Sequence, residues 1–164
     1  MTKLMLDDDL FYDEVLIVFA NTGQERNETL DFVKQCDEVF GFNTVWVEAV
    51  THHGTRKGCT HAITSHHDAN RDGRVFEDVI SKYGLPNVNY PHCNRELKLN
   101  PIRSYLRSIG WKHGSYDTAI GIRADEMDRV TIDYRKKGYH LPSLIQGCYE
   151  RICQRLVVKP AFQS

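Results

Sequence analysis

The sequence predicts an α/β fold built around a parallel β-sheet, and three stretches carry this prediction. Val15–Ala20 (VLIVFA) is a continuous apolar run rich in β-branched residues, as in strands buried on both faces. Thr44–Val50 (TVWVEAV) is a second such run, and a helical pattern separates the two. Strand, helix and strand within about 35 residues form a βαβ unit, which should be right-handed and parallel. Tyr116–Ile122 is the third predicted strand.

Composition places the chain among ordinary globular proteins. Its 164 residues are most simply one domain, with 41% hydrophobic and 26% charged residues. The net charge of −1 gives no global electrostatic case for nucleic acid or membrane, although local basic clusters can still matter. No apolar run approaches the ~20 residues of a membrane span, and no signal peptide follows Met1, which predicts the cytoplasm. Five scattered cysteines argue against a disulfide framework.

The first predicted strand leads into a helix. Thr22 and Glu25 have the spacing of a capping box, so a helix should begin there. Gly41 closes this helix. Five residues recur near helical spacing, with one polar exception among them: Leu30, Val33, Cys36, Asp37 and Phe40. The segment Asn21–Gln24, at a strand end and a helix start, could meet a ligand with its backbone N–H groups, although such a segment alone is more often a cap.

Thr51–Gly73 breaks the pattern and predicts a long polar loop without a clear period. It contains five histidines and one cysteine, a composition that suits zinc: His52, His53, Cys59, His61, His66 and His67. The spacings fit no closed metal site, so no metal ligands are assigned. A loop covering an anionic substrate is the favoured interpretation, with four candidate residues: His52, Arg56, Lys57 and His61.

Two further helices are expected. Val75–Tyr83 has its apolar residues on one side and ends at Gly84, and an irregular connector follows it. Asn94–Ser108 is helical in two parts, with Pro101 in the first turn of the second part. Its core-facing residues are expected to be Ile102, Tyr105, Leu106 and Ile109.

Two groups of residues flank or follow these helices. Cys93 sits just ahead of a helix, where the dipole would lower its pKa and make it a reactive thiol. Lys98 lies on the first turns and could reach an anion, or be a solvated charge. In the tail, an amphipathic pattern predicts a helix through Leu144, Ile145, Cys148, Ile152 and Leu156.

Tyr116–Arg129 reads as a buried strand that runs into a charged loop. Gly121 lets the backbone come close to a ligand, and Arg123, Glu126 and Arg129 follow. Fixed charges at the carboxyl edge of an open α/β sheet are typical of a ligand site, and an arginine fork suits phosphate or sulfate. The alternative is a surface loop with a salt-bridge network.

Together these residues resemble the phosphoadenosine phosphosulfate reductase family, and its phage and prophage members most closely. Three segments carry the resemblance, in the family's order over about residues 1–130. They are Val18–Glu25 with Glu28-Thr29, Tyr90–Lys98 with Pro101, and Ala119–Glu126 with Arg129.

The resemblance implies a three-layer, Rossmann-like, adenine-nucleotide alpha-hydrolase-like (ATP pyrophosphatase) fold with a parallel sheet. It implies an adenine nucleotide or sulfonucleotide as partner, with ATP and phosphoadenosine phosphosulfate as the candidate ligands, and no cofactor is assigned. Residues Asn21, Thr22, Gly23 and Gln24 would lie near the nucleotide. Lys98 and Arg123 would hold phosphate or sulfate, with Gly121, Glu126 and Arg129 in support. The expected division is a reductase-like domain, residues 1–130, and a divergent tail with a helix, residues 131–164.

The chain also departs from the family pattern. The pyrophosphate loop of the Ser-Gly-Gly-Lys type, the strand before it and the C-terminal Glu-Cys-Gly-x-His motif do not occur. Catalysis is therefore in doubt, because the loop's backbone N–H groups would stabilise charge at the phosphate. An N-terminally truncated sheet would expose an edge, which predicts a homo-oligomer or a covering partner. The alternative function is a non-catalytic interaction protein of phage or prophage origin.

Overall fold

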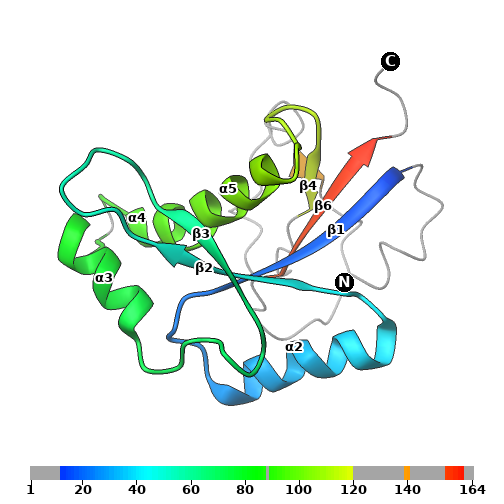
Figure 1. Ribbon diagram of the computed structural model, residues 1–164, viewed down its shortest axis with the longest axis horizontal. Helices are drawn as coiled ribbons and strands as arrows, with labels where there is room; N and C mark the ends of the chain where they lie inside the picture. The colour runs from blue at the N-terminus through cyan, green and yellow to red at the C-terminus, as the bar shows by residue number, and fades with distance from the viewer. Residues whose placement is uncertain (1–11, 88, 120–138, 141–153, 161–164) are drawn as a thin grey trace. The chain divides into compact units, whose positions relative to one another are not determined.

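The computed structural model describes residues 12–87, 89–119, 139–140 and 154–160, and shows a mixed α/β protein (Figure 1). The chain divides into two compact units. Val18–Trp111 forms one, and it contains the helices and most of the strands that position the candidate site. The second unit contains β4, β5 and β6.

The predicted βαβ unit is present. β1 (Tyr12–Asn21) and β2 (Val45–Val50) are parallel, with Val18 opposite Val45 and Asn21 opposite Glu48. α2 (Asn27–Phe40) connects them and ends at Gly41, whose left-handed backbone (φ 66°) lets its N–H bond to Asp37 O at 2.8 Å. The expected helix start at Thr22–Glu25 is wrong, because that pair closes a loop and the helix begins at Asn27.

Asp37, the polar exception in the apolar pattern of α2, has a structural role. Its carboxylate accepts hydrogen bonds from Thr44 Oγ1 at 2.5 Å and Thr44 N at 3.2 Å. These bonds tie the helix end to the start of β2. Phe40, by contrast, is 46% exposed and stacks on Phe42 rather than joining the core.

The sheet in this unit is mixed, not purely parallel as expected. β3 (Thr60–Thr64) pairs antiparallel with β2, with Val47 opposite Ile63. Thr51–Gly73 is therefore not a single loop: residues 51–59 connect the two strands of a hairpin. This strand was not predicted, because apolar and polar residues do not alternate along Thr60–Thr64. Its one large apolar side chain, Ile63, is 66% exposed.

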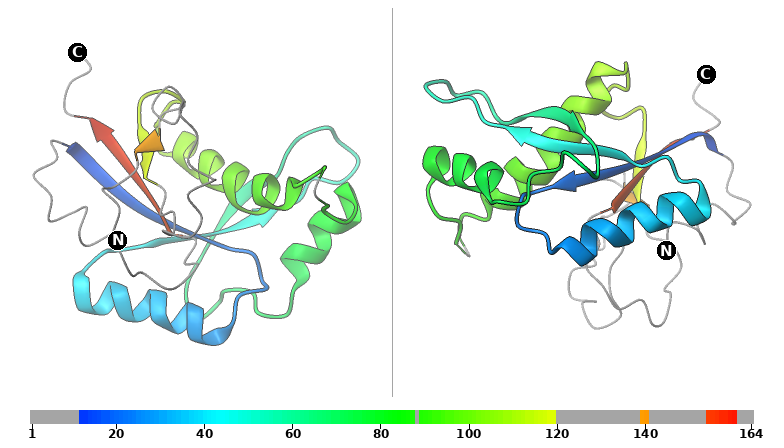
Figure 2. Two further views of the ribbon diagram at one scale, coloured as in Figure 1. Left: turned by 180° about the vertical axis from the view of Figure 1, so that it is seen from behind. Right: turned by 60° about the horizontal axis from the view of Figure 1, so that its bottom comes forward.

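Four helical segments complete the unit. α3 (Arg74–Tyr83) ends at Gly84 as predicted. α4 (His92–Asn94), the π-helix η1 (Arg95–Leu99) and α5 (Asn100–Ser108) follow without interruption, with Pro101 in the first turn of α5. α5 packs on β2 and β3, and the views in Figures 1 and 2 agree that α2 lies on the opposite face of these strands. In this unit, helices therefore lie on both faces of these strands.

The core of the unit lies between the sheet and these helices. Its fully buried side chains are mostly those expected from the apolar runs: Val18, Phe19, Val47, Leu30, Val33, Val79 and Leu106. Ile102 is also buried and Tyr105 is half-buried, but Ile109 is 43% exposed, because α5 ends at Ser108 and the chain turns at Gly110.

In the second unit β4 (Asp117–Ala119) confirms that a strand begins in the predicted stretch. It pairs parallel with β5 (Tyr139–His140) and antiparallel with β6 (Gln154–Pro160). The predicted tail helix lies largely outside the described residues, and Leu156, assigned to it, is in β6 instead. Within the described part of the chain, no helix is long and apolar enough to cross a bilayer.

Candidate functional site

The carboxyl ends of β1 and β2 are joined by a buried polar cluster. Asn21, the last residue of β1, is fully buried, and its Nδ2 donates to Glu48 Oε1 at 2.6 Å and to Asn70 O at 2.9 Å. Asn70 N donates to the same Glu48 oxygen at 2.6 Å. Because a buried amide without partners is costly, these bonds fix β1, β2 and the segment before α3 relative to one another.

The Thr22–Glu25 turn lies directly on this cluster. Asn21 Oδ1 accepts a hydrogen bond from Gly23 N at 3.2 Å, and the Glu25 carboxylate accepts from Thr22 N and Thr22 Oγ1, both at 2.9 Å. Gly23 has φ +78°, and a Cβ there would lie 2.5 Å from Asn70 Oδ1. The backbone conformation at this position therefore favours glycine, and a side chain there would also have to displace the Asn70 amide.

A second glycine closes the other side of the turn. Gly73 precedes α3 with φ +85°, and a Cβ on it would lie 2.5 Å from Gln24 Nε2. Asn70 Oδ1 is buried, and it has no hydrogen-bond partner among the described residues. The two glycines thus let the Asn21–Gln24 turn and the segment before α3 approach closely at the carboxyl edge of the sheet.

A second polar cluster joins η1 to the start of β3. Glu96 is 2% exposed, and its Oε2 accepts from Cys59 N and Asn100 Nδ2, each at 2.9 Å. Arg95 Nε donates to Oε1 at 2.8 Å. A Cβ on Gly58 would lie 2.9 Å from Asn100 Nδ2, so a larger residue there would have to displace the Asn100 amide that bonds to Glu96.

Electrostatics at this cluster favour a charged Glu96 and a protonated Cys59. Burial raises the pKa of Glu96, but the hydrogen bonds from Cys59 N–H, Arg95 and Asn100 outweigh it and hold the pKa below its ordinary value. Burial raises the pKa of the Cys59 thiol, which points to packing rather than reactivity. Cys93, expected ahead of a helix, instead lies within the short α4 and packs against Cys59, Val79 and Leu97.

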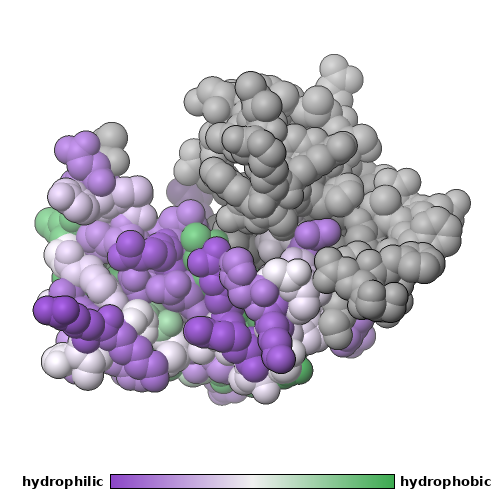
Figure 3. All heavy atoms as spheres, turned by 90° about the horizontal axis from the view of Figure 1, so that it is seen from above, coloured by the Kyte–Doolittle hydropathy of each residue, from purple (hydrophilic) through white to green (hydrophobic). Residues whose placement is uncertain are grey.

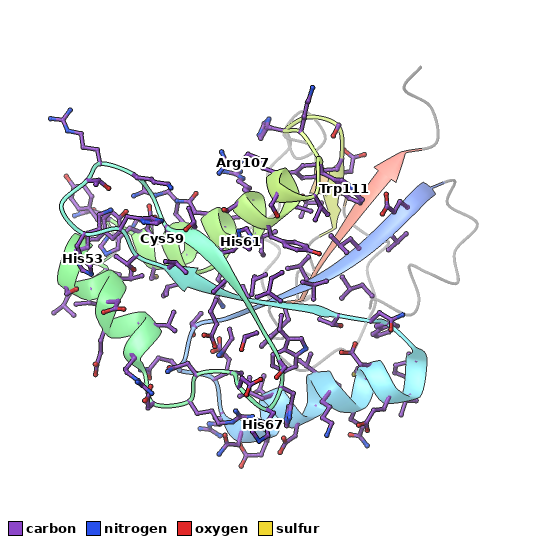
Figure 4. The ribbon with its side chains drawn as sticks, viewed as in Figure 1. His53, Cys59, His61, His67, Arg107 and Trp111 are labelled. Carbon is purple, nitrogen blue, oxygen red and sulfur yellow. The ribbon has the colours of Figure 1, made fainter. Side chains whose placement is uncertain are left out.

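The histidines of the predicted loop are dispersed, as the labels in Figure 4 show for His53, His61 and His67. Four of them have separate hydrogen-bond partners: His52 with Thr60 at 2.7 Å, His61 with Ser104 at 2.9 Å, His66 with Asp31 at 2.7 Å and His67 with Asp68 at 3.0 Å. In the described ranges no three His, Cys, Asp or Glu side chains gather as a metal site would require. The geometry of these residues therefore gives no support to a metal centre on this segment.

Some residues of the predicted nucleotide site lie within the described part of the chain, and others lie outside it. Asn21–Gln24 lie at the carboxyl end of β1, and Lys98 is half-buried in η1. Gly121, Arg123, Glu126 and Arg129 lie outside the described residues.

Sequence reasoning missed four polar residues that organise these clusters: Glu48, Asn70, Glu96 and Asn100. Glu48 carried a usable signal, since it is the one charged residue within an otherwise apolar strand. Glu96 carried none, because a carboxylate near a helix start is normally solvated.

Comparisons with known proteins identify two uncharacterized relatives. The chain is 26% identical over 126 residues to the uncharacterized protein MJ0973 of Methanocaldococcus jannaschii, covering 76% of this chain and 24% of that protein. It is 32% identical over 122 residues to the uncharacterized nin region protein ORF290 of Escherichia phage lambda, covering 71% of this chain and 41% of that protein. The chain thus spans less than half of either relative. No family model matches it, and no solved structure matches it.

Proposed function

We propose that this chain binds an adenine nucleotide or sulfonucleotide at the carboxyl ends of β1 and β2, in the manner of the phosphoadenosine phosphosulfate reductases that its sequence resembles. The observation that carries the proposal is the fixed turn Asn21–Gln24, which follows a buried parallel strand. Ligands of open α/β sheets bind at this edge, where turns after adjacent parallel strands lie together.

The chemistry of the turn supports a small polar ligand. The Asn21 side chain donates hydrogen bonds to Glu48 and to the Asn70 carbonyl, so the backbone of the next three residues is fixed before any ligand binds. Gly23 has no side chain to block a close approach, and Gln24 is exposed. In this proposal Lys98 and Arg123 bind the phosphate or sulfate groups, with Arg129 in support, and the domain belongs to the adenine-nucleotide alpha-hydrolase-like class.

Calorimetric titration of the full chain with ATP and with phosphoadenosine phosphosulfate tests the proposal. We expect saturable binding that is lost in Arg123→Ala and weakened in Lys98→Ala. Lys34→Ala is the matched control, because Lys34 is exposed on α2 and pairs only with Glu38 at 3.7 Å among the described residues. Absence of binding at millimolar nucleotide, in a variant set that is folded by circular dichroism, would refute the proposal.

A non-catalytic interaction protein is the second candidate. The similarity to a phage lambda protein favours it, as does the uncharged edge strand β3, which pairs only with β2 within the Val18–Trp111 unit. Such an edge can accept a strand from another chain. A stable dimer by light scattering, disrupted by Ile63→Lys and combined with no nucleotide binding, would support this candidate over the first; a monomer would count against it.

A further inference from the structure

Positive charge is concentrated in two segments of the Val18–Trp111 unit. Residues 51–67 and 95–111 together contain six lysines and arginines and one acidic residue, Glu96, in a chain with 21 basic and 22 acidic residues overall. Glu96 is buried and already bonded to Arg95. The net charge of −1 for the whole chain therefore does not reflect the local excess of positive charge in these two segments.

Three contacts hold the two segments together. Cys59 N donates to Glu96 at 2.9 Å, and His61 Nδ1 lies 2.9 Å from Ser104 Oγ. Gly58 lies beside Asn100, because a Cβ on Gly58 would come within 2.9 Å of Asn100 Nδ2. These contacts join the β2–β3 connection and β3 to the η1–α5 helix, so the two sets of cations lie on elements that pack against each other.

The four cations Arg56, Lys57, Arg103 and Arg107 differ in exposure: Arg103 is half-buried and the other three are exposed. Arg56 and Lys57 are exposed in the β2–β3 connection, and Lys57 O anchors it by accepting from Lys82 Nζ at 2.5 Å. Arg103 and Arg107 are one helical turn apart on α5 and so lie on the same side of it. Figure 3 looks at the molecule from the α5 side, and its coloured part is mostly hydrophilic; Figure 4 shows Arg107 extending from α5.

The dimensions and side-chain types suit an extended polyanion. The helical run from Arg95 to Arg107 spans about 18 Å, the length of several nucleotides of a single strand. Arginine forks bind phosphate, and imidazole rings can stack on unpaired bases. His53 is exposed and His52 and His61 are half-buried, and all three lie in the β2–β3 connection or β3, the elements that also carry Arg56 and Lys57.

We propose that the surface formed by the β2–β3 connection, β3 and the η1–α5 helix binds single-stranded nucleic acid through its phosphate backbone. The cationic residues assigned to it are Arg56, Lys57, Arg103 and Arg107. Binding is independent of sequence, because backbone contacts carry no base information. This proposal does not depend on nucleotide binding at the β1–β2 edge.

Fluorescence anisotropy of labelled oligo(dT) and oligo(rU) of about 16 nucleotides, titrated with the full chain, tests the proposal. We expect Arg103→Glu/Arg107→Glu to weaken binding at least tenfold. Affinity should fall with salt, and the slope of log K against log salt should be smaller in the double variant by about 1.4, the contribution of two lost phosphate contacts. The DNA and RNA probes together show whether the 2′-hydroxyl matters.

Arg26→Glu/Lys34→Glu is the matched control, since it reverses two charges at α2 on the opposite face of the sheet and should change affinity less than twofold. Arg103→Gln/Arg107→Gln removes the charges without reversing them and keeps the test valid if the glutamate variant unfolds. Equal binding by wild type and both arginine variants would overturn the proposal. So would an equal loss in the α2 control, a salt-independent affinity, or tighter binding to duplex DNA than to the single strands.

Discussion

Replacing Glu96 by alanine should destabilise the protein more than any exposed substitution on α5. The change removes a carboxylate that is 2% exposed and accepts three hydrogen bonds. Two of the donors, Cys59 N–H and the Asn100 amide, would lose their partner in a site that water does not readily enter. Each unsatisfied buried donor costs about 1–3 kcal/mol.

The expected loss is therefore about 2–6 kcal/mol, a large part of the roughly 5–15 kcal/mol that stabilises a domain. The third donor contributes little, because the Arg95 side chain is 58% exposed and solvent screens the pair. Arg95→Ala should accordingly cost no more than about 1 kcal/mol.

Urea unfolding followed by tryptophan fluorescence measures these values, because Trp46 and Trp111 are 5% and 4% exposed and will report loss of the core. The pH dependence adds an independent check. Since the folded-state pKa of Glu96 is lowered, its stabilisation is present above about pH 4.5 and is lost as the pH falls through the folded-state value. Glu96→Gln should therefore lose less stability on acidification than the wild type. A loss below about 0.5 kcal/mol in Glu96→Ala would refute the reasoning.

Three further substitutions have defined outcomes. Gly23→Ala should destabilise by about 1–3 kcal/mol in urea unfolding, because its φ of +78° is strained for alanine and the added Cβ meets Asn70 Oδ1; unchanged stability would contradict the close approach. Asp37→Ala should lower the unfolding free energy by about 1 kcal/mol by removing the acceptor for Thr44, and an equal midpoint would show that water replaces it. Burial lowers the pKa of His61, so the unfolded chain binds more protons than the folded chain, and the free energy of unfolding falls below about pH 6.5. His61→Gln should reduce this fall between neutral and mildly acid pH. If the stability of the wild type and of His61→Gln depends on pH in the same way, the assignment to His61 is wrong.

Elements with strong local signals could be predicted from the sequence. The apolar runs gave β1 and β2, helical spacing and terminal glycines gave α2 and α3, and Pro101 marked the start of α5. β3 could not be found this way, because Thr60–Thr64 owes its conformation to pairing with β2 rather than to a buried face of its own. The capping-box spacing of Thr22 and Glu25 gave a wrong helix start, because the same hydrogen bond between these residues also closes a non-helical turn.

The residues of the candidate site also differ in whether local sequence could predict them. The turn Asn21–Gln24 was predicted because it follows a recognisable strand. Glu48, Asn70 and Glu96 were missed, because their importance arises from contacts across 22 to 37 residues of sequence. Hydrogen bonds between residues so far apart in the sequence produce no periodic pattern from which they could be predicted.

The π-helical turn η1 absorbs one extra residue without changing the rotational phase of α5. In η1 the Asn100 N–H bonds to Arg95 O, five residues back, so the turn holds one residue more than an α-helix would. Deleting one residue within 95–99, other than Glu96, would allow a continuous α-helix with little change in the phase of α5, because the five-residue π turn and a four-residue α turn each complete about one revolution. Ser104 would stay beside His61, and both arginines of α5 would stay on the same side. A one-codon deletion here should therefore preserve both the helix content and the packing of α5 on β3, and alignments of relatives should place their gaps in this turn.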